Sequence, residues 1–308
     1  MSTAAVARRV EEPAAIPTSS ARLVLVQMAA MVRFTIRESL HRWTLMAFLL
    51  AVTLFLLLLA TTVNLDIVEG NLAAARLFGQ ELVLPNVGIE ISDVVETFQI
   101  IIITLLYIVG VALALFSTSN LVPRLCVDGW VDLLLAQPVT RPTLLLGRAT
   151  GAVAVVALNV SYLIVGSWIL LRWKTGFGNV GFLLAGAIIV FTFAVCYAGM
   201  VLVGVVTRNS PVSILAGLFF WISGHIFYPF HAYQEVWSTS LRAGWQRQTG
   251  IYITESLYWT LPKTQGLWEM ARNAAQGEPV SVSPLLFSLP FAVGSLALAC
   301  FWFTRRDY

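Results

Sequence analysis

Six long apolar segments restrict this chain to a helical fold embedded in a membrane. They lie near 44–63, 98–118, 149–171, 181–206, 212–230 and 284–303. Each is close to or longer than the ~20 helical residues that cross a hydrocarbon core. They are too continuous and too apolar for the strands of a membrane barrel. Only 11% of the 308 residues are charged, against about a quarter in a soluble domain. The sequence predicts an all-α polytopic membrane protein with six transmembrane helices.

The N-terminal region divides into two parts. Residues 1–20 are polar and contain proline, so we expect a disordered tail. Residues 21–308 are predicted to form one transmembrane domain. Its first segment, 21–42, alternates apolar residues with Arg33, Arg37 and Arg42. That pattern predicts an N-terminal amphipathic helix along the inner leaflet, ahead of the first span.

The distribution of basic residues predicts the orientation of the chain. With the N-terminus in the cytoplasm, twelve of the 19 Lys and Arg residues fall on the cytoplasmic side. Positive charge accumulates on that side of membrane proteins, so both termini are expected in the cytoplasm. Arg172 and Lys174 oppose this orientation, and we expect their long side chains to reach the interface beside Trp173.

Two sizeable outer loops follow from this topology. Segment 64–97 carries six carboxylates against one arginine, which makes it acidic. Segment 231–283 is rich in Trp and Tyr. Because these side chains prefer the headgroup level of a bilayer, we expect short interfacial or re-entrant helices there.

The chain lacks the motifs of the common catalytic and metal sites. It contains no G-x-x-x-x-G-K-[ST] loop, H-E-x-x-H, G-x-S-x-G or zinc-spaced Cys/His cluster. His225 and His231 are six residues apart, and we expect Pro229 to break the helix between them, so packed histidines are the favoured interpretation over a metal site. Few ionisable residues lie in the spans, which argues against a proton- or sodium-driven carrier. We expect no enzyme activity, no cofactor bound by this chain and no nucleic-acid partner.

The polar segment between the second and third spans is the strongest candidate for a functional site. Asp128 and Asp132 are four residues apart, so they share one face of a helix. Gly129 lies between them, and Trp130, Leu133 and Leu134 fall on other sides of the helix. Pro138 ends that helix, and Arg141 opens the next apolar run. A short amphipathic helix between two spans has no apolar partner in its own loop. It is suited either to the lipid interface or to a groove on another protein.

Residues 128–148 resemble the cytoplasmic loop of ABC-2-type permeases, the membrane subunits of one class of ATP-driven exporter. The tail after the last span, Phe303–Tyr308, is also similar to the ending of that family. Asp replaces the commoner Glu at 128 and 132, and the acidic 64–97 loop is a second departure. The positions that match the loop pattern are Asp128, Gly129, Asp132, Leu134, Leu135, Pro138, Val139, Arg141, Leu144, Leu145, Gly147 and Arg148.

The resemblance implies a set of partners. The loop helix would be a coupling helix that docks on a separate cytoplasmic ABC ATPase subunit, which binds ATP and Mg. A second permease copy, as homodimer or heterodimer, would complete the transporter in the plasma or inner membrane. The residues assigned to the ATPase contact are Asp128, Gly129, Trp130, Asp132, Leu133, Leu134, Pro138 and Arg141.

The alternative function is a membrane-embedded scaffold or assembly factor without transport activity, whose loop rests on lipid. A helix that rests on an anionic leaflet should be basic, whereas Asp128 and Asp132 make this one acidic at its centre. The substrate is not indicated by the sequence.

In the resembling family, the second and fifth spans face the seam between permease copies. Here these spans carry polar but uncharged residues, which would favour an amphiphilic cargo over a small ion. Alternatively, their hydroxyls bond to their own helix backbone and line nothing. The proposed path comprises Gln99, Thr104, Tyr107, Ser117, Ser213, Trp221, Ser223 and Tyr228.

Glycines in the third and fourth spans permit close contacts between helices. Packing of these helices within one chain is favoured over a seam between two copies.

Overall fold

The computed structural model describes residues 20–40, 43–62, 64–68, 71–77, 80–82, 91–126, 140–232 and 245–305. Within these ranges five helical runs are long and apolar enough to cross a membrane: Ser92–Thr118, Arg141–Thr175, Gly181–Thr207, Ser210–Ala232 and Ser283–Arg305. The first predicted span, 44–63, coincides with helix α2 (Trp43–Thr62). Within α2, the stretch Leu49–Thr61 is apolar. The predicted tail, residues 1–20, lies outside the described residues except for Ser20.

The spans are built from the following helices. Helix α1 (Ser20–Leu40) precedes α2. The second span joins α3 (Ile91–Leu105), a π-helical turn η1 (Leu106–Gly110) and α4 (Val111–Thr118). A 3₁₀ turn η2 (Pro123–Cys126) follows. The remaining helices are α6 (Arg141–Thr175), α7 (Gly181–Thr207), α8 (Ser210–Ala232), α10 (Trp245–Thr260), α11 (Thr264–Gln276) and α12 (Ser283–Arg305).

Two of the helices extend well beyond the apolar segments that predicted them. Helix α6 begins eight residues before 149, with Pro142 in its first turn, a position where proline costs no hydrogen bond. The second span begins at α3, so Asp93 and Glu96 are helical rather than part of the outer loop. Glu96 accepts a hydrogen bond from Gln276 Nε2 of α11 at 3.0 Å. The start of α3 thus has a polar contact with α11 outside the apolar run.

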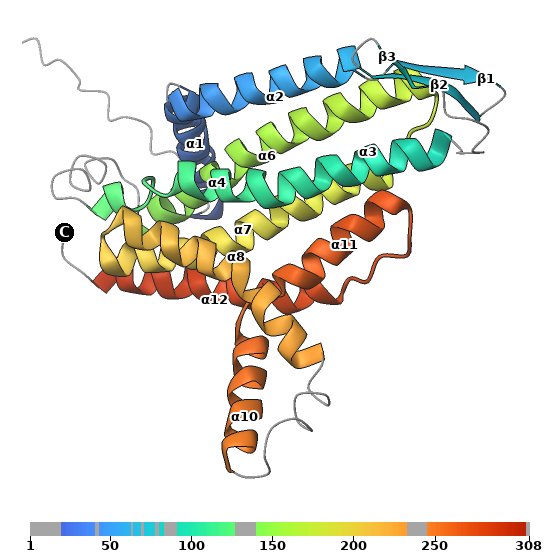
Figure 1. Cartoon of the computed structure of the whole chain (residues 1–308). Coiled ribbons are helices and arrows are strands. Elements are labelled where there is room, and N and C mark those ends of the chain that lie inside the picture. Colours follow the sequence, from blue (N-terminus) through green and yellow to red (C-terminus); the bar gives the residue numbers. More distant parts are fainter. Residues whose placement is uncertain are drawn as a thin grey trace, which may run out of the picture.

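The long helices run side by side, and α1 lies across one end of them (Figure 1). Helix α7 is central, because it packs against α6, α8, α11 and α12. The C-terminal end of α12 lies at the same end of the bundle as α1, whereas α10 projects away from the bundle beside α8 (Figure 1). Helices α10 and α11 fall in the segment where short interfacial or re-entrant helices were expected. Helix α11 packs against α3, α7, α8 and α12.

A small antiparallel sheet occupies part of the segment that was expected to be an outer loop. Strands β1 (Asn64–Val68), β2 (Asn71–Leu77) and β3 (Gln80–Leu82) pair in the order β1-β2-β3, with a register shift between Asp66 and Ile67. The sheet lies at the opposite end of the bundle from α1 (Figure 1). The membrane-crossing part of the described chain is helical, as predicted.

Proline does not end the fifth span where we expected it to. Helix α8 continues through Pro229 to Ala232, so the expectation that Pro229 breaks the helix between His225 and His231 is wrong. The final part of α8 bends away from its first part (Figure 1), as is usual where a proline removes one backbone hydrogen bond inside a helix. At the other end, α8 begins at Ser210 shortly after α7 ends at Thr207, and a hydrogen bond from Ser213 N to the Asn209 carbonyl at 3.1 Å closes its first turn.

Candidate functional site

The polar loop that carries the coupling-helix prediction is only partly described. Asp128, Gly129, Trp130, Asp132, Leu133, Leu134 and Pro138 lie outside the described residues, so their predicted roles stay predictions. Arg141 is the first residue of α6 and is half-buried. The described residues that flank the loop are η2 on one side and the start of α6 on the other. Thr140 and Thr143 share a hydrogen bond of 2.7 Å between their hydroxyls at the α6 end.

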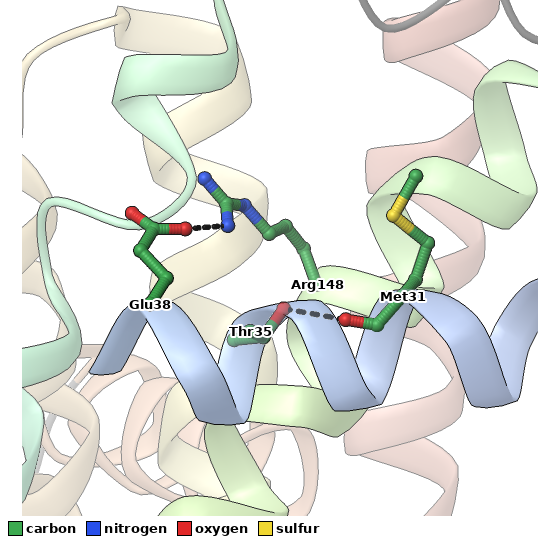
Figure 2. Close-up of polar contacts among 4 residues, drawn as sticks. All are labelled: Met31, Thr35, Glu38 and Arg148. Carbon is green, nitrogen blue, oxygen red and sulfur yellow. Dashed lines mark hydrogen bonds and ion pairs between the residues drawn. The ribbon is translucent and has the colours of Figure 1, made fainter. Parts of the chain in front are cut away.

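The second half of the loop motif is buried in the first turns of α6, and two of its residues contact α1. Leu144 and Leu145 are buried. The Arg148 side chain points from α6 toward Glu38 of α1 and forms an ion pair with its carboxylate (Figure 2). Arg148 is only 3% exposed, and its guanidinium carbon lies 5.5 Å from the centre of the Phe34 ring. A charge this deeply buried is stable only with its partner in place.

Two glycines let α1 approach the backbone of α6. A Cβ atom on Gly147 would lie 2.6 Å from Met31 Cβ, and one on Gly151 would lie 2.6 Å from Thr35 Cβ. Thr35 Oγ1 meanwhile donates to the Met31 carbonyl at 2.9 Å (Figure 2). The spacing Gly147-x-x-x-Gly151 is typical of close helix crossings. Here it serves a crossing within one chain, which is the interpretation that the sequence favoured.

Two predicted path residues, Tyr107 of the second span and Trp221 of the fifth, come together in an aromatic cluster. Their ring centres lie 5.9 Å apart. Tyr107 is buried in the π-helical turn η1, and its hydroxyl donates to the Thr264 carbonyl of α11 at 2.9 Å. Thr264 Oγ1 in turn donates to the Trp221 carbonyl at 2.9 Å. Thr264 therefore joins the second span to the fifth through α11.

Sequence reasoning missed the other aromatic members of this cluster. His225 and Trp268 place their ring centres 5.6 Å and 4.9 Å from that of Tyr107. A cavity of about 330 Å³ opens beside these rings, with Ile108 and Ile222 completing its wall. Trp268 was assigned to the aromatic outer loop. Its position on the amphipathic helix 264–276 was the signal that could have placed it against the spans.

The other predicted path residues do not join this cluster. Thr104, Ser117, Ser213 and Ser223 donate to carbonyls of their own helix or its first turn, at 2.7 Å, 3.1 Å, 3.0 Å and 2.8 Å. This is the arrangement that the alternative interpretation of these hydroxyls described. Gln99 is buried, with Nε2 unpaired within the described structure. Tyr228 and Ser223 line a different cavity, between α8, α10, α11 and α12.

Among the described residues, no group of three or more His, Cys, Asp and Glu side chains is placed to hold a metal ion. No protein-family model and no curated protein matches this chain. Its function is therefore argued from its residues and their geometry.

Proposed function

We propose that this chain is the membrane-spanning permease subunit of an ATP-binding-cassette transporter of the ABC-2 type, an exporter driven by a separate ATPase subunit. The observation that supports the proposal is the position of the second half of the loop motif. Leu144, Leu145, Gly147 and Arg148 are all buried, and Gly147 and Arg148 lie directly against α1. In this proposal α2 is the first of six spans, α1 is an amphipathic helix along the inner leaflet, and both termini are cytoplasmic.

This arrangement supports a mechanical role for the loop. Residues 127–139 are followed directly by the first turns of α6. Gly147 and Gly151 bring the backbone of α6 into close contact with side chains of α1, and Arg148 forms an ion pair with Glu38. Helix α1 and the start of α6 would therefore move as one rigid body. A force applied to the loop by the closing ATPase would then shift the end of the bundle rather than deform a flexible connection.

We expect Asp132→Lys to detach the ATPase subunit from the permease. Loss of one partner of a desolvated charge pair costs about 2–5 kcal/mol in binding, which is at least about thirtyfold in affinity. Affinity purification of the tagged chain from its native membrane, followed by assay of recovered ATPase activity, would measure the loss.

Asp93→Lys is the matched control, because Asp93 is an exposed carboxylate in the first turn of α3, outside the coupling loop. It should retain the ATPase. If Asp132→Lys recovered as much ATPase activity as Asp93→Lys, the coupling role of the loop would be refuted and the scaffold alternative favoured. Size-exclusion profiles of both variants would verify that the permease remains folded.

The same proposal assigns the Tyr107–Trp221 cluster to the seam between two permease copies. Tyr107 is itself buried, whereas Ile108 and Ile222, which line the cavity beside it, are 51% and 42% exposed. We expect cysteines at Ile108 and Ile222 to cross-link two copies in at least one nucleotide state. A cysteine at the exposed Leu298 of α12 should not. Absence of a cross-linked dimer in every nucleotide state would show that this face is not the seam.

A further inference from the structure

A cavity of about 310 Å³ lies between the end of α8, α10, the first half of α11 and the start of α12. Its lining residues differ from those around Tyr107. Its apolar walls include Phe227, Trp259 and Phe287. Two residues of opposite charge, Lys263 and Glu269, also line it. Cavities of this size with apolar walls and a few polar groups are typical of small-ligand sites.

Lys263 presents a buried cation to this cavity. The residue is only 7% exposed. Its Nζ donates to the Tyr258 carbonyl and lies 2.9 Å and 4.8 Å from the ring centres of Tyr258 and Trp259. Burial lowers the pKa of Lys263 to about 8, so the side chain is still mainly charged at pH 7. No carboxylate in the described part of the chain forms an ion pair with it.

Glu269 presents the opposite charge from the polar face of α11. Gln265, Glu269 and Asn273 are four residues apart in turn, and all three line the cavity. Gln265 Nε2 donates to Glu269 Oε1 at 3.1 Å. The other face of the helix carries the buried Leu267 and Ala271. The packing of α11 against the bundle therefore turns its carboxylate toward the cavity.

We propose that this cavity binds the head of an amphiphile that carries both an anionic group and an amine. Lys263 would hold the anionic group and Glu269 the amine, while the apolar chain lies against Phe227 and Phe287. A purely anionic head would be repelled by Glu269, and a purely cationic one by Lys263. A zwitterionic head supplies both the buried Lys263 and the half-buried Glu269 with a partner of opposite charge, which stabilises charges that water solvates poorly. A phosphoethanolamine lipid has this chemistry, as does a soluble zwitterion without a chain.

Binding can be measured on the full-length protein in a neutral maltoside detergent by native mass spectrometry. The probes are lysophosphatidylethanolamine, dodecyl phosphate, dodecylamine and phosphoethanolamine without a chain. We expect the lysolipid to bind tightest. Lys263→Met, which keeps the apolar stem, should weaken lysolipid binding about tenfold or more. Glu269→Gln should remove the preference for the lysolipid, so that this variant binds the lysolipid and dodecyl phosphate with equal affinity.

The chain offers a close control, because Lys174 is its only other lysine. Lys174→Met should leave lysolipid binding unchanged. Unaltered binding in Lys263→Met, or equal binding of dodecyl phosphate and the lysolipid to the unmodified protein, would overturn the zwitterion assignment. Binding of phosphoethanolamine as tight as the lysolipid's would overturn the role of the apolar chain. Because no ATPase is present in this measurement, its result is independent of the proposed transport function.

Discussion

Glu38→Ala is expected to loosen α1 from α6 and to destabilise the folded chain by about 3 kcal/mol or more. The mutation leaves the Arg148 guanidinium buried without its counter-charge, and the side chain of Arg148 is only 4% exposed. The Glu38 side chain is 28% exposed, so water reaches the vacated side and keeps the loss near the lower end of the range for buried pairs. A lower thermal unfolding midpoint in detergent would report the effect.

A double-mutant cycle separates the ion pair from simple loss of packing. Arg148→Met removes the buried charge, so Glu38→Ala added to Arg148→Met should cost much less than Glu38→Ala alone. Arg33→Met on the exposed face of α1 is the control and should leave the midpoint nearly unchanged. Equal costs of Glu38→Ala in both backgrounds would show that the two side chains do not stabilise each other.

Gly224→Ala is expected to force α11 away from α8. An added Cβ would lie 2.1 Å from Thr264 Oγ1 and 2.8 Å and 3.0 Å from the backbone nitrogens of Thr264 and Gln265. Because backbone atoms cannot rotate aside as a flexible side chain can, α11 must shift. The shift would strain the hydrogen bonds that link Thr264 to Tyr107 and Trp221. Overpacking and the loss of these bonds together predict a cost of about 3 kcal/mol.

Gly294→Ala in α12 is the matched control, because its added Cβ meets nothing within 4 Å. A gain of about 0.5–1 kcal/mol is expected from the better helix propensity of alanine. Adding Thr264→Ala to Gly224→Ala removes the closest overlap but not those with the backbone, so it should restore stability only in part. If the unfolding midpoint of Gly224→Ala equalled that of Gly294→Ala, α11 would not be held as closely as the structure shows.

The sheet and the start of α3 were not predicted, because both lie in the polar segment between the first two spans. Strands β1 to β3 arise in a segment that contains several carboxylates and no long apolar run, so no strand was predicted there. The bounds of α3 were set too late because Asp93 and Glu96 marked the segment as a loop. In the folded chain Glu96 has a partner in Gln276 of α11, and that partner lies 180 residues away in sequence. Local charge therefore did not indicate the end of the helix.

Long apolar runs were enough to predict the helical, membrane-crossing character of this chain, because a backbone in lipid must satisfy its own hydrogen bonds over the whole thickness of the hydrocarbon core. The loop motif that follows the second span was also recognisable in the sequence. Only the folded chain shows which motif residues pack inside the protein, how the rings of Tyr107 and Trp221 meet, and that Lys263 and Glu269 share a cavity. A span that is apolar on every side does not reveal which face turns inward. That choice depends on contacts with helices far away in the sequence.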